Sequence, residues 1–184
     1  MAFRMSKFVI LFISLLFVVN VNFAQKDNFK YSVSIKPVSI PNLPGLHSFV
    51  TAHSNGKWLV IGGRKDGSHA RQPFRAFPGD ENNTLIYVID VKAKKYWSAS
   101  VNELPISLKE QMQSGNMNYF QDGKILYITG GYAYSASEDD HITFPYLTSV
   151  SVPELINSVI NGNPVSPYFK QIKDYVFAVT GGQM

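Results

Sequence analysis

A recurring hairpin pattern constrains this 184-residue chain more than any other feature of its sequence. Each copy has an Asn-Gly or Asp-Gly pair, then an apolar run, then a double glycine. The first copy consists of Asn55-Gly56, the run 57–61 and Gly62-Gly63. The second copy consists of Asp122-Gly123, the run 124–129 and Gly130-Gly131. Because Asn-Gly and Asp-Gly pairs tolerate positive φ at both central residues, each copy predicts a β-hairpin closed by a type I′ turn. Two hairpins of one design indicate a repeat architecture.

The repeat extends to four strands, which we designate a to d in chain order. Runs rich in β-branched and aromatic residues, bounded by Gly, Pro, Asn and Asp, predict them. The expected strands are 34–40, 47–53, 57–61 and 85–90, then 96–101, 116–120, 124–129 and 147–152, and finally 168–172 and 175–180. The apolar spacing within 154–160, followed by Gly162, predicts one short helix between them.

The repeat resembles the kelch repeat, in which a hydrophobic strand ends in Gly-Gly and a later strand carries Tyr and then Trp. The residues that match are Gly62, Gly63, Gly130, Gly131, Tyr87 and Trp97. In the second copy no Trp follows the last strand. The resemblance runs from about Ser32 onward and implies an all-β, kelch-type β-propeller of four-stranded antiparallel blades. An ordinary β-sandwich with two similar hairpins is the alternative.

The expected blades are too few to close a ring. They span about 32–91 and about 95–152, with an incomplete third from about 168. Propellers close with ~4–8 blades, so we expect the N-terminal portion of a larger ring.

The first 24 residues have the layout of a secretory signal peptide. Basic Arg4 and Lys7 precede the apolar run 8–19, and a polar exit leads to Ala24. A membrane anchor is the alternative, but the run is shorter than the ~20 residues of a spanning helix. There is no cysteine for a lipid anchor or a disulfide. We expect residues 25–184 to be secreted or periplasmic, in a bacterium more than in a eukaryote, with no membrane span.

Charge and motifs argue against several classes of function. The formal net charge is +4, and the predicted signal peptide carries two of the basic residues, so no nucleic-acid partner is expected. Nucleophile-elbow, P-loop, dinucleotide and HExxH motifs are missing from the sequence, and we expect no cofactor. Among kelch-like enzymes, copper radical oxidases need a Cys-Tyr pair that this chain cannot supply.

Two long c–d loops, 64–84 and 132–145, are the predicted location of a ligand site. In an antiparallel blade they emerge on the same face as the a–b connections, where a protein or glycan partner would bind. Candidate ligand-binding residues are Arg64, His69, Arg71, Arg75, Tyr132, Tyr134 and His47. Arg side chains there would grip an anionic group. The alternatives are a solvated basic loop and, for His47, a structural imidazole.

The second loop also carries the acidic run 138–140 followed by His141. The weak metal-ligand candidates are Asp139, Asp140 and His141. A calcium-loop spacing is missing, and we expect a solvated acidic loop without a metal.

These observations predict an exported binding module that recognises a glycan, a peptide or an envelope protein through its c–d loops. The alternatives are a carbohydrate epimerase similar to sialic acid mutarotases, which the kelch resemblance suggests, and a truncated remnant without independent function.

Overall fold

The computed structural model describes residues 31–67 and 77–182, and the chain divides into two compact units, Met1–Pro37 and Val38–Met184. The predicted signal peptide lies outside the described residues. All the helices and strands described belong to the second unit, which is mostly antiparallel β-sheet.

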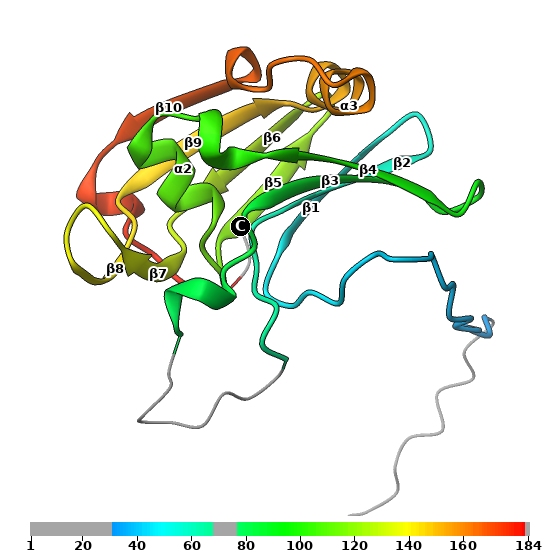
Figure 1. The fold of residues 1–184 in the computed structure, drawn as a ribbon, viewed down its shortest axis with the longest axis horizontal. Coiled ribbons are helices and arrows are strands. Elements are labelled where there is room, and N and C mark those ends of the chain that lie inside the picture. The colour runs from blue at the N-terminus through cyan, green and yellow to red at the C-terminus, as the bar shows by residue number, and fades with distance from the viewer. Residues whose placement is uncertain (1–30, 68–76, 183–184) are drawn as a thin grey trace, which may run out of the picture. The chain divides into compact units, whose positions relative to one another are not determined.

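The first sheet is a meander of four neighbouring strands in the order β1-β2-β3-β4 (Figure 1). These are β1 (Val50–Ser54), β2 (Lys57–Ile61), β3 (Leu85–Asp90) and β4 (Lys95–Ser100). The predicted type I′ turn between β1 and β2 is confirmed, because Asn55 and Gly56 both have positive φ, at 49° and 73°.

The second sheet has the order β10-β9-β6-β5. Its strands are β5 (Asn118–Asp122), β6 (Ile125–Thr129), β9 (Tyr146–Ser151) and β10 (Phe169–Lys173). The turn between β5 and β6 differs from the prediction. Asp122 pairs with Ile125, so the central residues are Gly123 and Lys124, and only Gly123 has positive φ. This is the pattern of a type II′ turn.

The other elements connect these strands. A hairpin of β7 (Tyr132–Ser135) and β8 (Asp140–Thr143) joins β6 to β9, and α2 (Ile106–Met112) joins β4 to β5. The predicted helix is confirmed as α3 (Val152–Asn161), which ends at left-handed Gly162. Short 3₁₀ helices are η1 (Gly79–Glu81), η2 (Val101–Glu103), η3 (Ser166–Tyr168) and η4 (Tyr175–Phe177). In Figure 1, α3 lies at one end of the strands, and η1 and the β7–β8 hairpin lie at the other.

The hydrophobic core forms between one face of each sheet, with α2 and α3 packed against it. Alternate residues of a strand point to opposite faces. The first sheet contributes Val50, Ala52, Leu59, Ile61, Ile86 and Val88, and the second contributes Leu126, Ile128, Val150 and Phe169. Trp97 of β4 is partly buried and packs against this core.

A buried glutamine fixes α2 to the second sheet. Gln111 donates from Nε2 to the carbonyl oxygens of Gly130, at 3.2 Å, and Tyr146, at 3.0 Å. Its Oε1 accepts from Thr148 Oγ1 at 2.6 Å and from Gln171 Nε2 at 2.9 Å. Because a fully satisfied buried amide specifies one arrangement, the side chains on the opposite side of α2 have a defined position.

The double glycines place the following chain segments against the ends of the strands. Gly63 N donates to Ser114 O at 2.9 Å, and Gly131 N donates to Val179 O at 2.9 Å. Gly62 has φ of +68°, and a Cβ there would lie 2.6 Å from the Ser114 carbonyl oxygen. Glycine is therefore required for both conformation and space.

Two predicted strands are wrong. Residues 34–40 contain no strand. In place of strand 175–180 the chain forms η4, because the Asp174 side chain accepts from Val176 N at 3.0 Å and closes a local turn.

The predicted division of strands between the sheets also differs, by one strand. A short turn, in which Lys94 has positive φ, keeps 95–100 paired with 85–90 in the first sheet. Likewise, 169–173 pairs with β9 in the second sheet. The two sheets therefore span 50–100 and 118–173, rather than the predicted blades 32–91 and 95–152. Among the described residues, the strands do not form a closed sheet.

Candidate functional site

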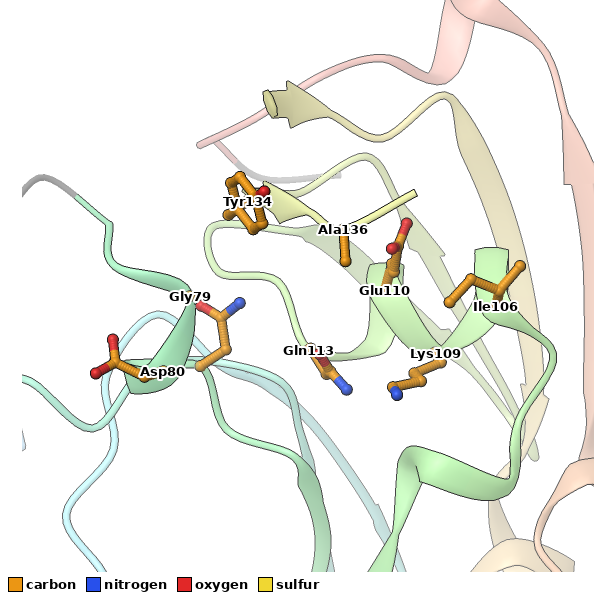
Figure 2. A pocket seen from close by; sticks show the side chains of 9 residues that line it. Gly79, Asp80, Ile106, Lys109, Glu110, Gln113, Tyr134 and Ala136 are labelled. Atoms are coloured by element: carbon orange, nitrogen blue, oxygen red, sulfur yellow. The ribbon is translucent and has the colours of Figure 1, made fainter. Parts of the chain in front are cut away.

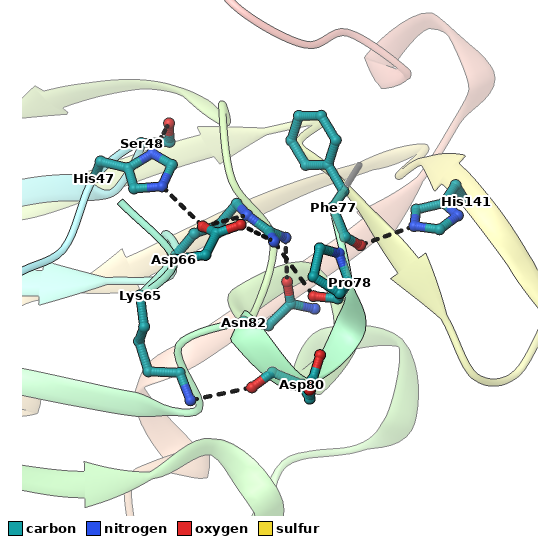
Figure 3. A network of polar contacts seen from close by, with 10 residues as sticks. His47, Ser48, Lys65, Asp66, Phe77, Pro78, Asp80, Asn82 and His141 are labelled. Carbon is teal, nitrogen blue, oxygen red and sulfur yellow. Dashed lines mark hydrogen bonds and ion pairs between the residues drawn. The ribbon is translucent and has the colours of Figure 1, made fainter. Parts of the chain in front are cut away.

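The β7–β8 hairpin packs on the described part of the first long loop. His141 Nε2 donates to the Phe77 carbonyl oxygen at 2.9 Å (Figure 3). The Tyr132 ring meets Phe77 edge-on with ring centres 5.1 Å apart, and His141 stacks on Tyr132 at 5.9 Å. The two loops that the sequence singled out therefore meet, through aromatic contacts and one hydrogen bond.

A pocket of about 380 Å³ lies beside this contact. Its walls come from η1, α2 and the β7–β8 hairpin, as Figure 2 shows. The residues that line it are Gly79, Asp80, Asn82, Ile106, Lys109, Glu110, Gln113, Tyr134 and Ala136. Its volume is within the range of small-molecule sites.

Glu110 supports one wall of the pocket as an anchor. The carboxylate is almost fully buried and accepts from Ser135 Oγ at 2.8 Å, Ser137 Oγ at 2.7 Å and Ser137 N at 3.0 Å. Burial alone would raise the pKa of Glu110, but the hydrogen bonds from Ser137 and Ser135 outweigh it, so the pKa lies below its ordinary value. Glu110 is thus ionised at neutral pH and holds the end of β7 and the turn after it to α2.

Two side chains with nitrogen donors, one on α2 and one at its C-terminal end, line the pocket. The Nε2 atom of Gln113 is buried and has no hydrogen-bond partner among the described residues. Lys109 lies one helical turn before it, and Figure 2 shows both nitrogens on the same side of α2. A buried donor without a partner costs about 1–3 kcal/mol, and an acceptor in the pocket would remove that cost.

Tyr134 supplies an aromatic wall opposite α2. Its hydroxyl donates to Asp139, and this hydrogen bond to a carboxylate raises the pKa of the phenol, which stays protonated. The ring packs beside Gly79, where an added Cβ would make an ordinary van der Waals contact with it at 3.5 Å, and it meets His141 edge-on at 5.4 Å. The ring is therefore fixed, while about a third of the residue stays exposed.

Arg64 lies next to this site but is occupied internally. It is 2% exposed, and its Nη2 and Nε donate to the two carboxylate oxygens of Asp66 at 2.7 and 3.1 Å. Nη1 donates to Asn82 Oδ1 at 3.0 Å, and the guanidinium lies over the Phe77 ring at 5.0 Å. All three nitrogens have partners, so the geometry favours a role in holding the loop over one in gripping a ligand.

His47 belongs to the same network. Its Nε2 donates to Asp66 Oδ1 at 3.1 Å, and its Nδ1 accepts from Ser48 Oγ at 3.0 Å (Figure 3). The Arg64 side chain, through its hydrogen bonds, lowers the pKa of Asp66 to about 2. The arrangement matches the structural imidazole that was the alternative prediction for His47.

The other sequence candidates divide into three sets. Tyr132 and Tyr134 lie in the hairpin, and Tyr134 lines the pocket. The metal-ligand candidates bind separate partners: Asp139 accepts from Tyr134, Asp140 accepts from the His141 backbone N at 2.7 Å, and His141 donates to Phe77. Residues 31–67 and 77–182 contain no group of three or more His, Cys, Asp or Glu that could hold a metal ion. His69, Arg71 and Arg75 lie outside the described residues.

The sequence analysis missed the pocket residues on α2, because it predicted no helix or strand between the expected strands 96–101 and 116–120. One signal was available. Leu108 and Met112 have helical i, i+4 spacing after Pro105, and both are buried. That pattern would have placed Lys109 and Gln113 together on another face of the same helix.

No protein-family model matches this chain, and no curated protein matches it. Within the part of the chain that the structure describes, no helix has the length and apolarity to cross a membrane.

Proposed function

We propose that this chain is an exported binding module of the kelch-propeller type, and that it binds a carbohydrate in the pocket between η1, α2 and the β7–β8 hairpin. The proposal joins three parts: the propeller architecture, the binding role and the ligand class. Each has its own support.

The propeller architecture is supported by the equivalence of the two sheets. Both are four-stranded and antiparallel, and both end their second strand in a double glycine. The same backbone contact follows each pair, from Gly63 to Ser114 and from Gly131 to Val179, at 2.9 Å in both. Repeated contacts between successive sheets are what radial repetition requires.

The binding role rests on one observation, the buried Nε2 of Gln113 at the pocket wall. Native proteins pair nearly all their buried polar groups. A donor left without a partner at the edge of a cavity is therefore best explained by an acceptor that arrives with the ligand.

The ligand class follows from the pocket lining. Amide, ammonium and carboxylate groups come from Gln113, Lys109 and Asp80, and an aromatic ring comes from Tyr134. Such a mixture suits a molecule with many hydroxyl groups and an apolar face, which describes a sugar. The internal pairing of Arg64 removes the strongest nearby group for a purely anionic ligand.

The carbohydrate-active enzyme alternative needs a group in the pocket that exchanges protons near neutral pH. Glu110 is unsuited to this task, because hydrogen bonds hold it in the ionised form. We therefore place Glu110 in the support of the pocket.

The test is saturation-transfer NMR of the folded chain with glucose, galactose, mannose, N-acetylglucosamine and N-acetylneuraminic acid. We expect one of these sugars to bind. Gln113→Met should weaken its binding by roughly 2–10-fold, the value of one hydrogen bond, without loss of stability. Lys170→Met, an exposed change on β10, is the matched control.

Two results would contradict the proposal. One is the absence of binding by all five sugars. The other is binding that neither Gln113→Met nor Lys109→Met weakens, which would place the ligand elsewhere.

A further inference from the structure

The two sheets present equivalent faces in the same order. Leu59 pairs with Val88 in the first sheet, and Tyr127 pairs with Ser149 at the equivalent place in the second. Side-chain alternation then defines two faces. The leading face has Ala52, Leu59 and Val88 in the first sheet and Phe120, Tyr127 and Ser149 in the second. The trailing face has Trp58, Val60, Tyr87 and Ile89 in the first sheet and Leu126, Ile128 and Val150 in the second.

Inside the chain, the leading face of the first sheet meets the trailing face of the second. Leu59 and Val88 share one buried cluster with Leu126 and Val150, and all four are fully buried. The contact is head-to-tail, because opposite faces of two equivalent sheets meet.

The other two faces lie at the ends of the stack and keep large apolar side chains in solvent. On the leading face of the second sheet, Phe120 is 54% exposed and Tyr127 is 37% exposed, with Ile172 of β10 beside them at 59%. On the trailing face of the first sheet, Trp58 is 47% exposed, whereas Val60 and Tyr87 are only 7% and 5% exposed where residues 43–49 lie against them. Among the described residues no further sheet pairs with either face.

The trailing end also has a shallow apolar hollow. Val60, Tyr87 and Ile89 form its floor, and Leu43, Pro44, Leu46 and Phe49 form its rim, around a volume of about 120 Å³. At the leading end, the aromatic rings of Phe120 and Tyr127 stand on neighbouring, directly paired strands. One end is thus recessed and the other projects aromatic side chains.

We propose that a second copy of this chain stacks on the first, with the leading face of one second sheet against the trailing face of the other first sheet. This contact pairs the same two kinds of face that already meet within the chain, and residues 43–49 form its rim. Every copy carries both faces, so one kind of chain supplies both sides of the contact. Contact between two leading faces would repeat no interface present in the molecule.

A contact between two different surfaces of identical chains is heterologous, and it extends to a closed ring or an open filament. The expected behaviour is a mass that rises with protein concentration beyond that of a dimer.

The experiment is sedimentation velocity of the chain over a concentration series from about 1 to 200 μM, which covers dissociation constants in the micromolar range. Tyr127→Asp changes the leading face, and Trp58→Asp changes the trailing face. Both side chains are partly exposed, so both variants should fold, which circular dichroism checks. Asn157→Asp, exposed on α3, is the charge-matched control and should assemble like the unaltered chain.

Mixing the two variants gives the decisive result. Each variant alone should remain a monomer, but Tyr127→Asp retains its trailing face and Trp58→Asp retains its leading face, so the mixture should form a 1:1 dimer and no larger species. Three results would overturn the proposal: an unaltered chain that is monomeric throughout, assembly abolished by only one of the variants, or two monomeric variants that form no dimer on mixing.

Discussion

The two loops that follow the double glycines leave the sheets from equivalent backbone positions and are held in different ways. Arg64 forms a bridge with His47, and Tyr132 forms the same bridge with Gly115. The first loop is held by an ion pair of its own, between buried Arg64 and partly buried Asp66. The second loop folds into the β7–β8 hairpin and is held from outside by Glu110 of α2.

This difference shows where a binding site can form. The first loop uses its charged groups on itself, so the most conspicuous residue in its sequence, Arg64, is buried and fully paired. The second loop takes its anchor from α2, and the space between them becomes the pocket. Arg64, the charged residue after the first double glycine, therefore fixes its own loop. The polar side chains that line the pocket, Lys109 and Gln113, lie instead on α2 and at its C-terminal end.

The largest effect is expected when the two equivalent residues, Arg64 and Tyr132, are each replaced by an uncharged or less polar residue of similar size and the free energies of unfolding are compared. Arg64→Met leaves Asp66 without its buried counter-charge and should lower the free energy of unfolding by about 3–5 kcal/mol. Tyr132→Phe should change it by less than about 0.5 kcal/mol, because the Tyr132 ring contacts are kept. Urea denaturation of both variants measures the difference. Equal losses would mean that the two loops are held alike.

A smaller loss of stability is expected at Gly62, where the first loop begins. Gly62→Ala should cost about 2–4 kcal/mol, since its left-handed backbone strains any side chain and the new Cβ would press on the Ser114 carbonyl oxygen. Gly123→Ala is the matched control. Gly123 has φ of +54° with no atom within 4 Å of the added Cβ, so it should lose only about 1–2 kcal/mol. If thermal unfolding shows equal losses, close packing at Gly62 is not what fixes the loop.

The smallest effect should separate the anchors by pH. The folded-state pKa of Asp66 is lowered from 3.8 to about 2. Its contribution is therefore complete above pH about 4 and is lost as the pH falls toward 2, by about 2 kcal/mol. Glu110 also has a lowered pKa and changes stability in the same direction. Urea denaturation of the unaltered chain and of Asp66→Asn at pH 5 and 2.5 gives the difference in their free energies of unfolding, which isolates the contribution of Asp66. If that difference is the same at both pH values, the ion pair of Asp66 does not stabilise the loop.

The hairpins could be predicted because their signals are local. Asn55-Gly56, Gly62 and the apolar run between them carry the turn, the end of the strand and its burial within a few residues. The assignment of 95–100 to the first sheet could not be obtained in the same way. Its pattern is that of any edge strand, and the short turn before it, rather than its own residues, selects the partner strand.

The pocket was harder to predict than the sheets, because its lining comes from three separate parts of the chain. Tyr134 was identified from its loop, but Gln113 and Lys109 carry no motif and become informative only when α2 is packed against the second sheet through Gln111. Arg64 shows the converse. Its sequence position suggested a ligand contact, and only its hydrogen bonds identify its partners.

The last described segment of the chain is seated mainly through its main chain. Val179 O accepts from Gly131 N at 2.9 Å and Gly181 N donates to Asn116 O at 2.8 Å, while the side chains of Tyr175 and Val176 project into solvent. Exchange of those side chains should therefore be well tolerated over evolutionary time. The stringent selection should fall instead on the glycine that receives the segment, a residue some fifty positions earlier.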